Sequence, residues 1–346
     1  MKIVEREVGP HAPPFVIAEL SGNHNGSLDR ALAIVDAAAD SGAHAVKIQT
    51  YTADTMTLDI REREFVITDP ASPWAGRSLY DLYEEAHTPW EWHAPIFERA
   101  RRRGMVAFST PFDATAVDFL ESLDAPCYKI ASFENTDLPL IRRVAATGKP
   151  LIVSTGMATL GEIDALVRAA RGAGCRDLVL LKCTSSYPSS PLDSNIRTIP
   201  HLREAFGCEV GLSDHTLGVG VAVASVALGA TVVEKHLTLS RAEGGVDSEF
   251  SLEPAEMRAL VDETLRAWQG LGAVRYGAGA AESGSKVFRR SLYFVRDLPA
   301  GATVAPGDIR AIRPGNGLPP SAADLVMGRT LRRPVTRGTP VQWDLL

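Results

Sequence analysis

The sequence has little cysteine and no long apolar run. Four of its 346 residues are cysteine, without paired spacing, and we expect reduced, mostly buried thiols. No apolar stretch approaches the roughly 20 residues of a membrane span. Residues 1–14 also lack the apolar core of a secretory signal. These absences predict a cytoplasmic protein that has no membrane partner.

An excess of basic residues is absent too. The chain has 36 Lys and Arg against 42 Asp and Glu, which gives a formal net charge of −6. The basic run "RARRRG" at 99–104 falls at the expected end of a helix, where cations are favourable. We therefore expect no nucleic-acid partner.

What the sequence does contain is a repeating pattern of short apolar runs separated by helix-like segments. Runs alternating with helices indicate a parallel sheet, and eight units over about 250 residues predict a closed (β/α)₈ TIM barrel. The alternative is an open doubly wound sheet, but no glycine-rich phosphate fingerprint follows any run. The eight runs are 15–20, 45–50, 105–110, 127–132, 151–156, 178–183, 209–214 and 231–236.

Two parts of the chain depart from this repeat. Residues 51–93 are too long for one connection and are rich in Trp and Tyr, so we expect them to wall one side of a site. Residues 275–286 are rich in Gly, Ala and Ser, as in a linker, and residues 287–346 are short β runs punctuated by Pro and Gly. We expect a catalytic barrel at 1–274 and a small β-rich domain at 287–346.

Nearly every predicted strand ends in polar residues. In a closed parallel barrel these ends meet at one rim, which is where active sites of this fold lie. A single polar ending would be a cap, whereas eight that converge on one rim predict a site. The residues concerned are Glu19, Lys47, Gln49, Ser109, Thr110, Lys129, Ser132, Glu134, Ser154, Thr155, Thr184, Ser185, Ser213, His215, Glu234 and His236.

Two of these residues are histidines on neighbouring strands. Side chains alternate along a strand, so Ser213 shares a face with His215, and Glu234 shares a face with His236. If both faces point inward, the two imidazoles approach each other at the barrel mouth. With nearby oxygen ligands they would suit a divalent ion such as Mn²⁺, Mg²⁺ or Co²⁺. The alternative is two histidines that are hydrogen-bonded separately.

Lys47 and Lys129 are lysines within apolar strands, where lysine is rare unless it is paired or functional. Three interpretations follow from the residues alone. A lysine could be a Schiff-base nucleophile, as in an aldolase. The two could clamp an anionic ligand, which the surrounding serine hydroxyls favour. They could also form ion pairs with Glu19, Glu134 or Glu234.

The order of the strand-end motifs resembles the sialic acid synthase family over essentially the whole chain. The motifs are "IAELSGNHNG", "VKIQT", "FSTPFD", "YKIASFE", "STGMA", "CTSSYP", "GLSDHT" and "EKH". The tail "RRSLYF…IRPGNG" is similar to that family's small antifreeze-like (SAF) domain. The resemblance implies condensation of phosphoenolpyruvate with an N-acetylated amino sugar, which gives a nine-carbon α-keto acid and phosphate.

Several motifs resemble the branch of the family that makes pseudaminate. The first strand reads "AELSGNHNG", where neuraminate-forming members usually have "AEIGINHNG", and the fourth reads "ASFE". Ser248 stands where neuraminate-forming members usually have histidine. This implies 2,4-diacetamido-2,4,6-trideoxy-L-altrose as the acceptor. The alternatives are a neuraminate, legionaminate or other nonulosonate synthase and, more remotely, a non-catalytic sugar or anion binder.

The resemblance also implies roles for individual residues. His215 and His236 match metal ligands, and Arg313 matches an arginine that the small domain supplies to a partner's barrel in a swapped homodimer. Glu19 or Glu134 would help to move protons. The positions that match phosphoenolpyruvate contacts are Lys47, Lys129, Ser132, Ser154 and Ser213, with Thr110 and Ser185 as further rim hydroxyls. The sugar-side positions are Glu19, Gln49, Glu134, Tyr187 and Asp247.

Overall fold

The computed structural model describes residues 1–70 and 72–346 and contains a closed barrel of eight parallel strands. The predicted barrel is confirmed, and each predicted apolar run supplies one strand. The strands are β3 (Phe15–Glu19), β4 (Ala45–Thr50), β5 (Val106–Pro111), β6 (Tyr128–Ile130), β7 (Leu151–Ser154), β8 (Leu178–Cys183), β9 (Glu209–Ser213) and β10 (Val232–His236). β10 pairs with β3 and closes the barrel, with His236 opposite Glu19.

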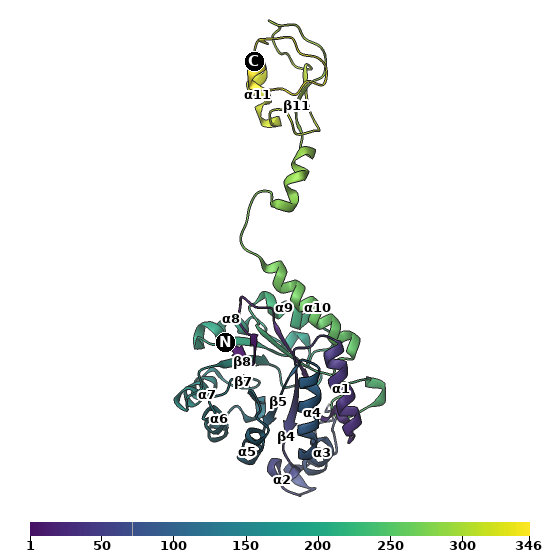
Figure 1. Ribbon diagram of the computed structural model, residues 1–346, viewed down its shortest axis with the longest axis vertical. Helices are drawn as coiled ribbons and strands as arrows, with labels where there is room; N and C mark the ends of the chain where they lie inside the picture. The colour runs from purple at the N-terminus through teal and green to yellow at the C-terminus, as the bar shows by residue number, and fades with distance from the viewer. Residues whose placement is uncertain (71) are drawn as a thin grey trace. The chain divides into compact units, whose positions relative to one another are not determined.

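Helices surround the strands (Figure 1). They are α1 (Leu28–Asp40), α4 (Trp90–Arg102), α5 (Ala114–Ser122), α6 (Leu138–Ala145), α7 (Leu160–Gly172), α8 (Thr198–Phe206), α9 (Gly220–Ala227) and α10 (Pro254–Leu271). Local signals fix several ends. Thr159 and Glu162 form a capping box at the start of α7, and Gly207 ends α8 at a φ of 55°. None of the helices in the described ranges combines the length and apolarity that a bilayer span requires.

The strand alternation explains how the barrel positions a site. Outward residues such as Val16 and Val46 pack against the helices in one large apolar cluster. Inward residues such as Ile17, Ala45 and Phe108 form a second cluster, which fills the barrel. Strands such as β3, β4 and β5 therefore carry apolar inward residues along their first part and polar inward residues at their C-terminal end.

The connections add short elements that the sequence pattern did not predict. β1 (Lys2–Ile3) and β2 (Arg6–Glu7) form a small hairpin before the barrel. Between β4 and α4 lie α2 (Ala53–Met56), η2 (Arg63–Phe65) and α3 (Leu79–Ala86). The segment predicted as an insertion at 51–93 is thus shorter, because α4 already begins at Trp90. Short 3₁₀ turns follow several strands: η1 (Ser21–His24), η3 (Ser132–Glu134), η4 (Pro191–Asp193) and η5 (Arg241–Glu243).

The chain divides into two compact units, Met1–Gly272 and Ala273–Leu346. The second unit has its own apolar core, to which Leu292, Phe294 and Val326 belong. Its β11 (Ser291–Phe294) and β12 (Ile309–Ile312) pair antiparallel. The stretch expected to be a linker runs into η6 (Ala280–Phe288), and the unit ends with η7 (Pro320–Ala322), α11 (Ala323–Val326) and η8 (Trp343–Leu345).

Candidate active site

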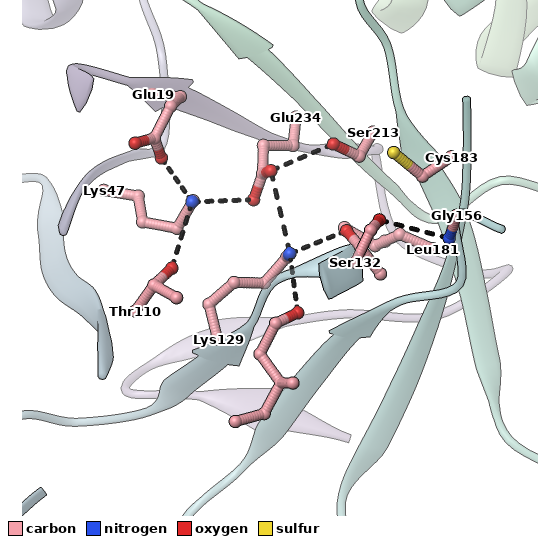
Figure 2. Close-up of polar contacts among 12 residues, drawn as sticks. Glu19, Lys47, Thr110, Lys129, Ser132, Gly156, Leu181, Cys183, Ser213 and Glu234 are labelled. Atoms are coloured by element: carbon pink, nitrogen blue, oxygen red, sulfur yellow. Dashed lines mark hydrogen bonds and ion pairs between the residues drawn. The ribbon is translucent and has the colours of Figure 1, made fainter. Parts of the chain in front are cut away.

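A chain of buried charges crosses the barrel mouth (Figure 2). Lys47 on β4 forms an ion pair with Glu19 on β3, and its Nζ lies 3.8 Å from Glu234 Oε2 on β10. Lys129 on β6 reaches the other oxygen of Glu234, with Nζ–Oε1 at 3.9 Å. Glu234 on β10 therefore lies between two lysines, which come from β4 and β6, the strands on either side of β5. This is the ion pairing that the third interpretation of the lysines describes.

Hydroxyl groups complete the surroundings of both lysines. Lys47 Nζ donates to Thr110 Oγ1 at 3.2 Å, and Lys129 Nζ donates to Ser154 Oγ at 2.6 Å. Ser213 Oγ donates to Glu234 Oε1 at 3.0 Å. The cluster thus combines two amines with neutral hydroxyls, which is the chemistry that binds phosphate and carboxylate oxygens.

The charges set the protonation of this cluster. Burial opposes the charged form of Lys47, but Glu19 and Glu234 outweigh it and hold the pKa of Lys47 above its ordinary value. Burial lowers the pKa of Lys129, and Glu234 offsets this only in part. Burial would raise the pKa of Glu234, but Lys129 and Lys47 more than compensate and lower it. Glu234 is therefore a carboxylate, and Lys47 is a cation that does not favour Schiff-base chemistry.

A glycine shapes the side of the cluster next to Lys129. Gly156 N–H donates to Ser132 Oγ at 3.1 Å. A Cβ added at Gly156 would lie 2.3 Å from Ser185 Oγ and 2.6 Å from Ser132 Oγ. The two predicted hydroxyls can therefore converge here only because residue 156 has no side chain.

The two predicted histidines do lie together. The ring centroids of His215 and His236 are 5.3 Å apart. His215 Nδ1 lies 3.0 Å from Thr184 O, and since a carbonyl only accepts, Nδ1 carries a proton, which leaves Nε2 as the ligand atom of the neutral ring. Burial, together with His215 and Lys47, lowers the pKa of His236 well below its usual range. Both rings therefore have a nitrogen that can act as a ligand.

The imidazole nitrogens of His215 and His236 are the donors that a metal ion could use at this site. His236 Nδ1 is buried and has no hydrogen-bond partner in the described part of the chain. Within residues 1–70 and 72–346, no group of three or more His, Cys, Asp or Glu side chains is arranged to hold a metal. The imidazole pair therefore fits a divalent ion as two protein ligands, with oxygens of substrate or water left to complete its coordination.

An aromatic wall stands beside the histidines. The Tyr187 ring lies 4.5 Å from that of His215, and the Phe250 ring lies 4.9 Å from that of His236. Trp74, from the segment between β4 and α4, packs on Tyr187 at 5.8 Å and donates from Nε1 to Val246 O. Part of the predicted insertion therefore packs against the aromatic side chain that contacts His215.

The remaining predicted residues occupy different surroundings. Asp247 is buried and accepts from Gly22 N–H at 3.3 Å. Gln49 is half-buried and lies opposite Thr110 in the β4–β5 register. Burial raises the pKa of Glu134 to about 7, against the pull of Lys129. Arg313 is exposed and belongs to the second unit.

Some residues at the site were not singled out by sequence reasoning. Cys183 Sγ lies 3.9 Å from His215 Nδ1, and it was predicted only as a buried thiol. Phe250 and Gly156 were also missed, because their positions depend on which loops meet at the rim. The in-phase spacing of Cys183 with Leu181 at a strand end was the one available signal for the cysteine.

Comparisons with known proteins agree with this geometry. The NeuB family model matches residues 34–276, and the SAF domain model matches residues 289–346. Pseudaminic acid synthase of Campylobacter jejuni is 42% identical over 324 residues, which cover 94% of each chain. N,N'-diacetyllegionaminic acid synthase of Legionella pneumophila is 36% identical, covering 95% of this chain and 94% of that one.

A solved structure shares the fold. The N-acetylneuraminic acid (sialic acid) synthetase of Leptospira borgpetersenii superposes with a TM-score of 0.74 at 30% identity, covering 82% of this chain and 94% of that one. The family match spans well over half of the chain and includes seven of the eight barrel strands. The resemblance predicted from the strand-end motifs is confirmed, and the chain belongs to the NeuB family.

Proposed function

We propose that this chain is a synthase that condenses phosphoenolpyruvate with open-chain 2,4-diacetamido-2,4,6-trideoxy-L-altrose, giving pseudaminate and phosphate. The observation that carries the proposal is the 42% identity to a pseudaminic acid synthase along 94% of both chains. The lower identity to the legionaminic acid synthase, 36%, makes a legionaminate product the less favoured alternative. The buried charges at the barrel mouth supply the chemistry that such a reaction needs.

The lysine–hydroxyl cluster would hold phosphoenolpyruvate. Its phosphate and carboxylate are acceptors, and Lys47 and Lys129 present buried ammonium groups to them. The hydroxyls of Ser132, Ser154, Ser185, Ser213 and Thr110 supply neutral donors around these amines. Held in this way, the enol carbon is oriented toward the histidine pair, where the aldehyde of the sugar would lie.

The reaction balances without an oxidant or a covalent enzyme intermediate. The C3 carbon of phosphoenolpyruvate attacks the aldehyde carbon, and the aldehyde oxygen takes up a proton. Water adds to the cationic C2 that results and loses a proton. The tetrahedral species then breaks its C2–O bond, so that phosphate leaves with the bridging oxygen and the α-keto acid remains.

The chain's own residues would orient and protonate the reacting groups. A divalent ion on His215 and His236, Mn²⁺ in our proposal, would supply Lewis acidity to the aldehyde carbonyl. Burial raises the pKa of Glu134 to about 7, which suits a group that exchanges protons near neutrality. Glu19, whose pKa is also raised by burial, is the other candidate for proton transfer. Gln49, Tyr187 and Asp247 would bind the sugar.

We further propose a homodimer in which the domain at 287–346, with Arg313, serves the barrel at 1–274 of a second copy. Support comes from the loops that follow β6, β7, β8 and β9, which are neighbours around the barrel. These loops expose large apolar side chains at one rim, where a partner would cover them. The residues are Phe133, Met157, Leu192 and Leu217, together with Leu160 at the start of α7.

The test is phosphate release from phosphoenolpyruvate by metal-stripped protein to which Mn²⁺ has been returned. Parallel reactions contain the altrose sugar, its counterpart for legionaminate, or N-acetylmannosamine. We expect release only with the altrose sugar, and ¹⁸O placed in the bridging oxygen should appear in the phosphate.

The other outcomes separate the alternatives. Release with another sugar would keep the reaction and change the substrate. Trapping of a lysine adduct by borohydride would support a Schiff-base aldolase instead. No release by folded protein with any of the sugars, together with sugar binding in calorimetry, would indicate a binder that does not turn over.

A further inference from the structure

Ser21, two residues beyond the end of β3, has a backbone conformation that L-residues rarely adopt. Its φ is 50°, and the residue is 3% exposed. A left-handed conformation places Cβ close to backbone oxygen, and glycine is the residue that normally occupies it. Such strain persists where the surrounding structure uses it, most often at functional sites.

The adjacent Gly22 shows the opposite constraint. A Cβ added there would lie 3.3 Å from Ala86 Cβ at the end of α3 and 3.4 Å from Val246 Cβ in the loop after β10. Gly22 therefore allows η1 to lie close to both segments. Ser21 therefore carries a side chain although its backbone conformation is strained. Gly22, which has no side chain, is the residue at which η1 approaches α3 and the loop after β10 closely.

Both residues use this arrangement to hold Asp247. The Ser21 hydroxyl donates to Asp247 Oδ2, and Gly22 N–H donates to the same oxygen at 3.3 Å. The backbone of Asp247 is held separately, because Ser251 Oγ donates to its carbonyl at 2.6 Å. Oδ1 makes no hydrogen bond to any residue that the structure describes.

Asp247 is placed where an acceptor sugar would be. Ser21 follows Glu19 on β3, and Asp247 follows His236 on β10; these two strand ends lie opposite each other in the barrel register. Lys47, which pairs in register with Glu19, and Lys129 lie within strands, whereas Asp247 belongs to the loop beyond the end of β10. A carboxylate fixed over the seam between Glu19 and His236 can therefore meet the sugar rather than the phosphate.

We propose that Ser21 is a positioning residue that determines affinity for the acceptor sugar: its hydroxyl fixes Asp247 so that Oδ1 accepts a hydrogen bond from a sugar hydroxyl or amide N–H. This role rests on the proposed function, because it takes an N-acylated sugar as the second substrate. It goes beyond that function by assigning selection of the sugar to a strained serine outside the reacting cluster.

Two substitutions separate the hydroxyl from the strain. Ser21→Ala removes the hydroxyl and keeps the strain, whereas Ser21→Gly removes both. We expect both variants to raise the KM for the sugar about tenfold, as expected for loss of a charged hydrogen bond. The KM for phosphoenolpyruvate should change by less than twofold. Only Ser21→Gly should raise the melting temperature, by about 2 °C or more.

Two controls exclude a general structural effect. Asp124 also has a positive φ, 55°, and its side chain is 99% exposed. Asp124→Gly should therefore raise the melting temperature without changing either KM. In an Asp247→Ala background, Ser21→Ala should change the KM for the sugar by less than twofold, because Ser21 acts only through Asp247.

Binding is measured apart from turnover, using the non-reacting alditol made by reducing the altrose sugar. With phosphoenolpyruvate present, calorimetry should give a Kd about tenfold higher in both Ser21 variants. Unchanged KM and Kd in an active protein would overturn the role of Ser21 and leave the proposed function standing. If the protein has no turnover but binds the alditol, and the Ser21 variants lose that affinity, the role of Ser21 would stand and the proposed function would be overturned. A wild-type protein that neither binds nor converts any of the sugars would overturn both.

Discussion

Gly156 illustrates how the absence of one side chain determines the anion-binding end of the site. Ser132 and Ser185 both occupy the space that a Cβ at residue 156 would fill. In Gly156→Ala these hydroxyls must move, and the N–H that donates to Ser132 moves with them. Displacing oriented donors by about 1 Å costs roughly 10²-fold in rate.

We therefore expect Gly156→Ala to fold normally and to lose about 10²-fold in kcat/KM. The matched control is Gly161→Ala in α7, because a Cβ there meets no atom within 4 Å. That variant should keep full activity and gain slightly in stability, since alanine favours helix. Equal activity of the two variants would contradict the close approach of the serines.

Glu134 should make the free energy of unfolding depend on pH, and substituting this residue alone should remove its contribution. Burial raises its pKa from 4.5 to about 7. A carboxyl whose pKa is raised by folding stabilises the fold below its unfolded pKa, and this contribution is lost as the pH rises through the folded value. Between pH 4.5 and 8, wild type should thus lose about 1–3 kcal/mol of unfolding free energy relative to Glu134→Gln.

Urea titrations of both proteins at several pH values measure this difference. A constant difference across the range would mean that Glu134 keeps an ordinary pKa in the folded protein.

At the scale of the elements, a further buried ion pair joins β9 and β10 outside the barrel. Lys235, between Glu234 and His236, points away from the site and donates to Asp214 Oδ2 at 2.8 Å and to Thr216 O at 2.6 Å. Asp214 in turn accepts from Thr216 N–H at 3.0 Å. The pair fixes the turn that carries His215 to the strand that carries His236.

Breaking this pair should be costly. We expect Lys235→Met to destabilise the barrel by about 3–5 kcal/mol, because it leaves the carboxylate of Asp214 buried without its cation. Adding Asp214→Asn should recover part of the loss. The control is the exposed pair Arg143–Asp118, where Arg143→Met should cost less than about 1 kcal/mol. Equal losses of unfolding free energy for Lys235→Met and Arg143→Met, measured by chemical denaturation, would contradict the prediction that the buried pair stabilises the barrel.

Much of the element scale was predictable, and for a physical reason. The eight runs are apolar on both faces, and their order and polar ends follow directly from the parallel barrel. Short elements were missed: β1 and β2 have two residues each, too few for any periodicity. The start of α4 was misplaced because Trp90 and Trp92 look like part of an aromatic insertion, although Trp92 packs against the helical core layer.

The alternation of side chains along each strand predicted which site residues face inward, but it predicted nothing further about the site. Phase places Lys47, Glu234 and His236 on inward faces, but it does not say which lysine meets which carboxylate. That depends on register across β10 and β3 and on the barrel's width. Ser21 and Gly156 were out of reach for the same reason, since their partners come from loops far away in the sequence.

At the scale of the whole molecule, the two units have separate cores. We expect a fragment of residues 1–272 to fold, with the circular dichroism spectrum of a barrel, and to lose about tenfold or more in kcat/KM because it lacks Arg313. Arg313→Ala in the full chain should reproduce that loss. Full activity of the fragment would contradict the assignment of Arg313 to the site.

The proposed dimer makes its own prediction. Light scattering should give twice the chain mass of 37.1 kDa. Leu192→Asp combined with Leu217→Asp should yield monomers that remain folded, because both side chains are exposed in the single chain. Val4→Asp, at an exposed position in the N-terminal hairpin, is the control and should remain dimeric. A monomeric wild type would contradict the proposal.

The closure of β10 on β3 also bears on how the chain is made. While the ribosome is still short of residue 232, β3 and β9 both present unpaired edges, and Lys47 has only one of its two carboxylates. Unpaired edges invite aggregation during synthesis. The barrel can close only after β10 has been made, so this protein should depend on chaperones until translation is about two-thirds complete. Slowing synthesis just before residue 232 should therefore harm its yield more than slowing it after residue 236.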